Sequence, residues 1–366
     1  MKIAFDAKRF FHNASGLGNY SRDLVRVLAS FYPENTYLLL SEKASERGKA
    51  ILALPNVDFK ETSNGFLARQ RQMGIDAQNL GATIFHGLSG ELPLRWSRSS
   101  IKKIVTIHDL IFMRYPQYYR WFDRKIHFWK FRNAAQQADL VIAISEQTKR
   151  DIMHYLQIPE SKIRVVYQGC HQAFKEVLNE EFLSRLREKY PLPKRFILNV
   201  GTIEPRKNLL NIVKSLKGTG IPLVVVGKPQ KKYFEKVQKE IRKGAVDVLF
   251  LQGVTMEELA GLYRLADVFV YPSIFEGFGI PVIEALFSGT PVITSNTSCL
   301  PEAGGEAALY VHPNSVEDLR AKIAYLWENE SERIRRREKG LAFVKKFNDE
   351  AIARNLMAVY REVLES

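Results

Sequence analysis

The stretch Tyr271-Pro-Ser-Ile-Phe-Glu-Gly-Phe-Gly-Ile-Pro-Val-Ile-Glu284 joins an apolar strand, predicted over residues 267–271, to a helix predicted over residues 280–287. Pro281 suits the first turn of that helix, where its missing N–H costs nothing. The two glycines of the Gly-Phe-Gly turn allow the backbone to come close to a ligand or to adopt positive φ. The stretch therefore predicts a strand, a ligand-facing loop and a helix in succession.

Two carboxylates, Glu276 and Glu284, lie eight positions apart across this turn. We expect Glu276 in the loop above the strand end and Glu284 in the first turns of the helix. The helix N-terminus offers free N–H groups and the positive end of a dipole to a phosphate. The carboxylates can accept hydrogen bonds from sugar hydroxyls. A helix start with Glu284 near the dipole explains this stretch equally well, so both interpretations stay open.

Strand and helix patterns alternate on both sides of this unit. The predicted strands are residues 2–7, 36–40, 82–86, 103–108, 140–145 and 163–167 in the first half, and 196–200, 222–226, 246–251, 267–271, 291–294 and 308–311 in the second. Amphipathic segments between them, such as residues 17–32, 208–216 and 257–265, predict helices. This alternation predicts an α/β fold with two doubly wound parallel sheets, each covered by helices on both faces.

A length of 366 residues favours two domains. The strand pattern stops over residues 171–194, which we interpret as a linker with one short helix. The expected domains are residues 1–170 and 195–347, with a final helix over 348–366 packing back on the first domain. Ligands bind at the carboxyl ends of the strands in such sheets, so the cleft between the domains is the expected site.

The composition excludes several classes of protein. With 46% hydrophobic and 26% charged residues, the chain is globular rather than disordered. Its two cysteines, Cys170 and Cys299, exclude a zinc ribbon or a disulfide scaffold and favour a reducing, cytosolic setting. No apolar stretch of about 18 residues predicts a membrane span. The net charge of +14 favours phosphates, anionic lipid or nucleic acid as partners, with simple solubility as the equal alternative.

Two adjacent cations follow the strand predicted over residues 196–200. Arg206 and Lys207 lie in the loop Gly201-Thr-Ile-Glu-Pro-Arg-Lys-Asn208, before a helix expected to start at an Asn208 cap. The planar fork of arginine and the point charge of lysine suit a diphosphate. A solvated basic loop is the alternative.

Two further motifs lie in the first half. Ser15-Gly-Leu-Gly-Asn-Tyr20 departs from the dinucleotide fingerprint, because Ser21 occupies the third glycine position and the second predicted strand, residues 36–40, does not end in an acidic residue. We therefore exclude NAD binding and keep the diphosphate of another ligand open. His108 ends a strand and can bind a hydroxyl or a developing charge, unless it is a packing residue. His86 ends another strand and is the weaker candidate.

Together these motifs resemble the retaining glycosyltransferases of family 4, which have the GT-B fold of two Rossmann-like domains facing across a cleft. The similar segments are SGLGNYSRDL (residues 15–24), TIHDL (106–110), GTIEPRKN (201–208), EGFGIPVIEAL (276–286), FSGTPVI (287–293) and LPEAGGEAALYVHP (300–313). The resemblance covers nearly the whole chain.

The resemblance implies a nucleotide-sugar donor held mainly by the C-terminal domain. The donor-binding residues it implies are Gly16, Gly18, Arg206, Lys207, Glu276, Gly277, Phe278, Gly279, Ile280 and Glu284. The catalytic residues it implies are His108, Arg206, Lys207 and Glu276. Glu284 would bind the ribose hydroxyls, and His108 would face the reacting side of the sugar. The chain has no Asp-x-Asp motif, so we expect no metal or other cofactor, and Arg206 with Lys207 would stabilise the departing diphosphate.

The function that the resemblance implies is metal-independent transfer of a hexose, with retention, to a saccharide or lipid-linked saccharide acceptor. Mannose from GDP-mannose is the favoured donor. The enzyme is expected in the cytoplasm, peripheral at the inner face of the membrane, with no nucleic-acid partner. The alternatives are a nucleotide-sugar epimerase or phosphorylase on the same fold and, from another class, a basic nucleic-acid-binding protein.

Residues 112–132 concentrate aromatic and basic side chains. They hold nine aromatic residues, six Lys or Arg and one acidic residue, Asp123. Within the segment, a helical stripe is formed by Tyr118, Phe122, Ile126 and Trp129. Such a segment can lie on an anionic membrane surface, with its aromatic rings among the headgroups. A core-facing stripe with a solvated basic side is the alternative, and the sequence leaves both open.

Overall fold

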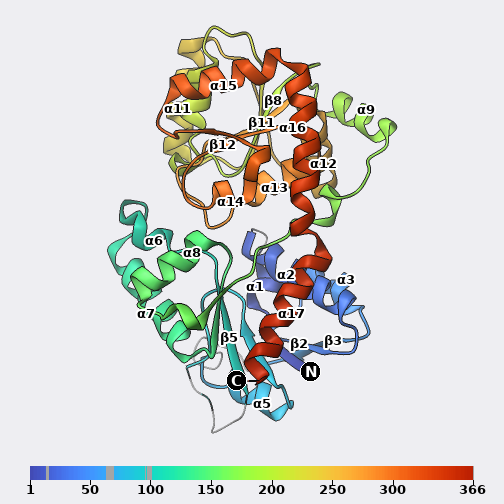
Figure 1. Cartoon of the computed structure of the whole chain (residues 1–366), viewed down its shortest axis with the longest axis vertical. Coiled ribbons are helices and arrows are strands. Elements are labelled where there is room, and N and C mark those ends of the chain that lie inside the picture. Colours follow the sequence, from blue (N-terminus) through green and yellow to red (C-terminus); the bar gives the residue numbers. More distant parts are fainter. Residues whose placement is uncertain (14–15, 63–69, 95, 97–100, 366) are drawn as a thin grey trace. The chain divides into compact units, whose positions relative to one another are not determined.

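The computed structural model describes residues 1–13, 16–62, 70–94, 96 and 101–365, which form two compact units (Figure 1). The N-terminal unit consists of Met1–Gly169 and Phe347–Ser366, and the C-terminal unit of Cys170–Lys346. Residues 171–194 belong to the C-terminal unit, because their side chains pack within it. Phe174 lies edge-on to Tyr263 at a centroid distance of 5.7 Å, and the hydroxyl of Tyr190 donates to Glu258 at 2.9 Å.

In the described part of the N-terminal unit, seven parallel strands pair in the order β3-β2-β1-β4-β5-β6-β7. Their bounds are β1 Lys2–Asp6, β2 Thr36–Ser41, β3 Val57–Glu61, β4 Ile84–Gly87, β5 Lys102–Ile107, β6 Leu140–Ala143 and β7 Ile163–Val165. Six of the seven were predicted from the sequence. The exception, β3, is an edge strand in which only Val57 is buried, so its apolar pattern is weak.

Helices cover both faces of this sheet. The longer helices are α2 Gly16–Phe31, α5 Met73–Asn79, α7 Trp121–Gln137 and α17 Asp349–Glu365, and the shorter ones are α1 Lys8–His12, α3 Lys49–Leu52, α6 Ile111–Arg114 and α8 Glu146–Asp151. Successive residues of β1 point to opposite faces. Ile3 belongs to the core beneath α2 and α17, whereas Ala4 belongs to the core beneath α5 and α7.

The last helix, α17, lies beside α2 in the N-terminal unit (Figure 1). Its predicted cap is confirmed, because Asn348 Oδ1 accepts a hydrogen bond from the N–H of Ala351 at 2.8 Å. The predicted apolar stripe is buried in the core and consists of Ile352, Leu356, Val359, Tyr360 and Val363. The N-terminal unit is therefore built from both ends of the chain.

The sheet of the C-terminal unit has six parallel strands among the described residues, in the order β10-β9-β8-β11-β12-β13. Their bounds are β8 Ile197–Val200, β9 Leu223–Val226, β10 Val248–Leu251, β11 Val268–Tyr271, β12 Val292–Ser295 and β13 Leu309–Val311. The helices are α9 Glu180–Lys189, α10 Leu209–Leu216, α11 Lys231–Gly244, α12 Met256–Leu265, α13 Ile280–Phe287, α14 Leu300–Gly304, α15 Val316–Glu328 and α16 Glu330–Phe343. Both units confirm the predicted doubly wound α/β architecture, whose strand order reverses beside the first strand of each sheet.

No described helix combines the length and hydrophobicity needed to cross a bilayer. Cys170 and Cys299 are both buried.

Candidate active site

The loops after β8 and β11 meet at the carboxyl edge of the C-terminal sheet, because these two strands are neighbours. This is the position at which the strand order reverses, where open α/β sheets bind ligands. The N–H of Ile274 donates to the Arg206 carbonyl at 2.9 Å, and the hydroxyl oxygen of Ser273 lies 3.1 Å from the same carbonyl oxygen. These contacts hold the two predicted loops together.

Lys207 and Glu276 form the centre of the site. The Lys207 ammonium donates to Glu276 Oε1 at 2.7 Å and also contacts the hydroxyl of Tyr271. The same carboxylate oxygen accepts hydrogen bonds from Tyr271 at 3.0 Å and from Ser273 at 2.5 Å. The carboxylate predicted from one loop and a cation predicted from the other are therefore in direct contact.

Arg206 completes this cluster. Its Nη1 forms an ion pair with Glu276 Oε1 at 2.8 Å and donates to the Phe275 carbonyl at 2.7 Å. Its Nη2 donates to Glu204 Oε1 at 2.6 Å. The guanidinium is mostly buried and fixed on both edges, so Arg206 is held in place rather than solvated in a basic loop.

The charges in the cluster stabilise one another. Burial alone would raise the pKa of Glu276, but Lys207 and Arg206 lower it to about 2. Burial opposes ionisation of Arg206, yet Glu276 and Glu204 raise the pKa of its guanidinium. Two cations face two carboxylates, so the cluster of Arg206, Lys207, Glu204 and Glu276 carries no net charge.

Glu284 has a different environment. It lies in the second turn of α13, and its Oε2 accepts a hydrogen bond from the hydroxyl of Tyr263 on α12 at 3.0 Å. Burial raises its pKa to about 7, against the opposing effects of that hydrogen bond and of the Lys207 charge. Lys207 thus influences both carboxyl groups of the motif.

The turn between the two carboxylates has the predicted special backbone. Gly279 has a φ of 104°, and an added Cβ would lie 2.9 Å from Leu300 Cδ2. Only glycine suits this position, from which α13 begins at Ile280 with Pro281 in its first turn. Phe278 is buried, whereas Gly277 is partly exposed, so Gly277 is the position of this turn at which the backbone is accessible.

One feature of the basic loop differs from the prediction. Asn208 precedes α10 but does not cap it with its side chain. It has a φ of 63°, and its amide donates to the Pro272 carbonyl at 3.1 Å and to the Pro313 carbonyl at 2.6 Å. Asn208 therefore anchors the loop to neighbouring segments instead of satisfying the helix N-terminus.

In the N-terminal unit, His108 follows β5 at the carboxyl edge of the sheet. Its Nε2 bonds to the Leu88 carbonyl at 2.9 Å, and its ring lies edge-on to Tyr20 of α2 at 4.5 Å. Burial lowers its pKa to about 4, despite the Leu88 contact. Because a carbonyl only accepts, the neutral ring carries its proton on Nε2 and leaves Nδ1 as an acceptor.

The glycine motif lies close to this histidine. Gly16 opens α2 and is exposed, while Gly18 is buried against the Asn13 carbonyl, where an added Cβ would lie 1.9 Å from the oxygen. Close packing against the Asn13 carbonyl therefore explains why residue 18 is a glycine. Ser15, the first residue of the motif, lies outside the described residues.

His86, the weaker candidate, lies inside the N-terminal unit. Its two ring nitrogens bond to Tyr360 of α17 at 2.7 Å and to Thr106 of β5 at 2.8 Å. It therefore has a structural role.

The structure arranges the predicted residues in two groups. The C-terminal unit brings together Arg206, Lys207, Glu276 and the start of α13 with Glu284, and the N-terminal unit brings together His108 and the glycine motif. Sequence reasoning missed Glu204, Tyr263, Tyr271 and Ser273, which bind the predicted side chains. Glu204, Tyr271 and Ser273 lie within the quoted motifs, and this position was the signal that the sequence offered for them.

Comparisons with known proteins identify both halves of the chain. Residues 14–173 match the model of Glycosyltransferase Family 4, and residues 184–359 match that of glycosyl transferases group 1. The O-antigen chain mannosyltransferase B of Escherichia coli is 28% identical, over 99% of this chain and 100% of the relative. The O-antigen chain mannosyltransferase RfbU of Salmonella typhimurium is 30% identical, over 60% of this chain and 59% of its own. A glycosyltransferase structure from Rickettsia africae superposes with a TM-score of 0.78 at 19% identity, covering 100% of this chain and 99% of the other.

Proposed function

The chain belongs to glycosyltransferase family 4, a retaining family, and has the GT-B fold, and we propose that it transfers mannose from GDP-mannose to a saccharide or lipid-linked saccharide acceptor. The choice of mannose follows the names of the relatives, which are mannosyltransferases of O-antigen chains. A polysaccharide acceptor follows from the same names.

The observation that carries this proposal is the convergence of Arg206 and Lys207 on Glu276 at the carboxyl edge of the C-terminal sheet. Cleavage of the bond between the anomeric carbon and the diphosphate leaves negative charge on the leaving group. Cations that are already fixed in place stabilise such charge without reorganisation. In this proposal Arg206 and Lys207 take that role without a metal ion.

The remaining residues of the site bind the donor. Glu276 and the backbone of Gly277 to Ile280 bind the hexose, and Glu284 accepts hydrogen bonds from the ribose hydroxyls. Nδ1 of His108 accepts a hydrogen bond from a sugar hydroxyl, because the ring is neutral near pH 7. Retention then follows from attack by the acceptor hydroxyl on the face from which the diphosphate departs.

A thermal-shift panel of GDP-, UDP- and ADP-sugars tests the donor and its binding residues. We expect GDP-mannose to stabilise the wild type, by about 2.7 kcal/mol at a concentration 100 times its Kd. Arg206→Ala and Glu284→Ala should each lose the stabilisation, measured against their own ligand-free Tm. Lys236→Ala, at an exposed position on α11, is the matched control and should keep it.

Two results would overturn parts of this proposal. Equal stabilisation of the wild type and both site variants would remove Arg206 and Glu284 from the donor site. Loss of sugar transfer after treatment with EDTA, with recovery on adding a divalent cation, would show that the two cations do not replace a metal.

A further inference from the structure

The outward side of α7 carries an exposed aromatic surface. Of the thirteen exposed large hydrophobic side chains among the described residues, six lie between positions 118 and 129. Phe122 is 71% exposed, Trp121 59%, Ile126 54% and Trp129 53%. The inward side packs on the sheet through residues such as Phe131 and Ala135. The predicted stripe thus faces solvent, and the core-facing alternative from the sequence is wrong.

Cations flank these aromatic side chains. Arg120, Lys125 and Arg132 are exposed, and the Lys125 ammonium lies 5.6 Å from the centre of the Trp121 ring. The helix has a single acidic residue, Asp123. We call the following set the α7 patch: Tyr118, Tyr119, Arg120, Trp121, Phe122, Lys125, Ile126, Trp129 and Arg132.

The other two Lys or Arg residues of α7 hold the helix in place and are not part of the patch. Arg124 donates through Nε to the Phe112 carbonyl at 3.1 Å. Lys130 donates to Glu91 at 3.3 Å. The patch is therefore carried on a helix whose orientation is fixed by separate contacts.

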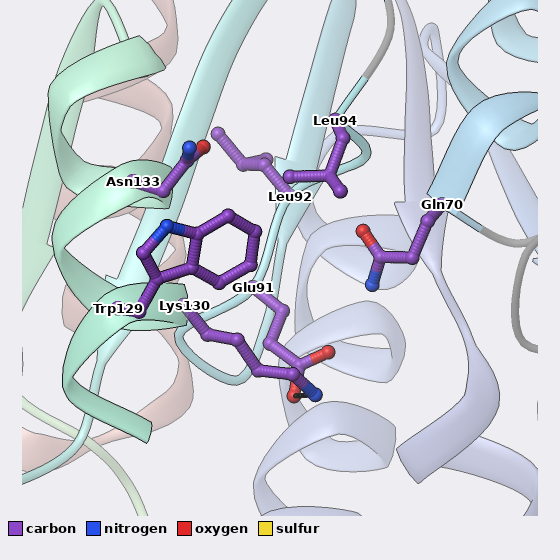
Figure 2. Close-up of a pocket in the computed structure, with 7 residues that line it drawn as sticks. All are labelled: Gln70, Glu91, Leu92, Leu94, Trp129, Lys130 and Asn133. Carbon is purple, nitrogen blue, oxygen red and sulfur yellow. Dashed lines mark hydrogen bonds and ion pairs between the residues drawn. The ribbon is translucent and has the colours of Figure 1, made fainter. Parts of the chain in front are cut away.

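A small pocket adjoins one end of the patch. In Figure 2 the Trp129 ring faces Leu92 and Leu94, above the pair formed by Lys130 and Glu91. The pocket holds about 150 Å³, less than the roughly 300–1,000 Å³ of typical small-molecule sites. It extends the apolar surface beyond Trp129 but is too small to hold a nucleotide or an oligosaccharide.

We propose that the α7 patch docks on a bilayer rich in anionic lipids. Aromatic and aliphatic side chains on one side of a helix enter the headgroup region, and neighbouring Lys and Arg side chains pair with anionic headgroups. A second copy of the chain is a poorer partner, because twofold pairing would bring Arg120, Lys125 and Arg132 against the same cations. The inference does not depend on the identity of the sugar donor.

Co-sedimentation with vesicles, in the absence of any sugar nucleotide, tests this proposal. We expect the full chain to pellet with vesicles of equal parts phosphatidylglycerol and phosphatidylcholine, and not with phosphatidylcholine alone. The triple variant Arg120→Glu, Lys125→Glu and Arg132→Glu should bind at least tenfold more weakly. The matched control Lys232→Glu, Lys236→Glu and Lys239→Glu changes the net charge equally on exposed positions of α11 and should stay within about twofold of the wild type.

A second variant tests the aromatic contribution. Trp121→Ser with Phe122→Ser keeps every cation and should also bind at least tenfold more weakly. Circular dichroism should show all variants folded, since the substituted side chains are exposed.

Three results would overturn the proposal. One is a wild type that stays in the supernatant with anionic vesicles. Another is equal weakening by the α7 and α11 charge variants, which would reduce the effect to net charge. The third is a wild-type dimer in analytical ultracentrifugation that the serine variant dissociates, which would assign the patch to self-association.

Discussion

Glu276 and Glu284 belong to one short motif but have opposite proton affinities. Lys207 and Arg206 lie against Glu276 and lower its pKa to about 2, so its carboxyl group is ionised near neutral pH. Among the described residues, the Tyr263 hydroxyl is the only direct partner of the Glu284 carboxyl group, and burial raises the pKa of that group to about 7. The spacing of the two residues along the chain does not reveal either pKa, because both pKa values depend on side chains from other elements.

This difference predicts that donor binding depends on pH through Glu284. A protonated carboxyl group loses one acceptor for the ribose hydroxyls, so affinity should fall as the pH drops through about 7. Titration calorimetry with GDP between pH 5.5 and 8.5 measures this dependence. Glu284→Gln should bind more weakly at pH 8.5 and lose the step near pH 7.

Tyr263→Phe provides the matched control. It removes the hydrogen bond that lowers the Glu284 pKa, so the midpoint should move to higher pH. A step near pH 7 that persists in Glu284→Gln would assign the titration to another group.

Much of the fold could be predicted because buried parallel strands read as short apolar runs. All six strands of the C-terminal sheet agree with prediction within two residues. The edge strand β3 was missed because its sequence, Val-Asp-Phe-Lys-Glu, has little to bury. The orientation of α7 could not be predicted, because an apolar stripe at helical spacing has the same pattern whether it faces the core or solvent.

The candidate site was predictable to a similar extent. Arg206, Lys207 and Glu276 lie in loops at strand ends, and neighbouring strands bring such loops together. The pairing of Arg206 with Glu204 was hidden, because a strand end, a loop and a helix start specify positions but not side-chain directions. Asn208 was misassigned as a cap because the same residue type also suits a left-handed backbone.

His86 connects three elements of the N-terminal unit, since it lies on β4 and bonds to Tyr360 of α17 and Thr106 of β5. His86→Leu would leave the buried Tyr360 hydroxyl without this partner, at about 1–3 kcal/mol. It would also remove one bond of the Thr106 hydroxyl, which keeps its contact with the Tyr20 hydroxyl at 3.3 Å. We therefore expect faster hydrogen exchange in β4, β5 and α17, with the C-terminal unit unaffected. Tyr360→Phe removes only one of these bonds but leaves the buried Nδ1 of His86 unpaired, and it should cost about 1–3 kcal/mol.

The pH dependence of this contact has a definite sign. Burial, with a smaller effect of His108, lowers the His86 pKa to about 3, below the value of about 6.5 in an unfolded chain. Between these two pH values, His86 is protonated in the unfolded state but not in the folded state. The stability that neutral His86 contributes is therefore fully present above pH 6.5 and is lost as the pH falls toward 3. In His86→Leu that part of the acid sensitivity should disappear, and an unchanged acid profile would contradict the assignment.

The two units differ in how the chain forms them, because one is a single continuous segment and the other is built from two segments. The C-terminal unit is one continuous segment, Cys170–Lys346, whereas the N-terminal unit needs α17 from the far end of the chain. Eight residues of α17 are buried, among them Leu356, Met357 and Tyr360. The N-terminal unit therefore cannot complete its core until the last residues of the chain are present.

Truncation after Lys346 should separate the two units in stability. Each large apolar side chain removed with α17 withdraws roughly 1.5–3 kcal/mol of burial, and a domain's whole stability is only about 5–15 kcal/mol. Hydrogen exchange should therefore become fast throughout β1 to β7 and stay slow in β8 to β13. Arg354→Ala with Arg361→Ala, which alters only exposed positions of α17, is the control and should leave both sheets protected. If β1 to β7 stay protected in the truncated chain, α17 is an accessory to that core and not a part of it.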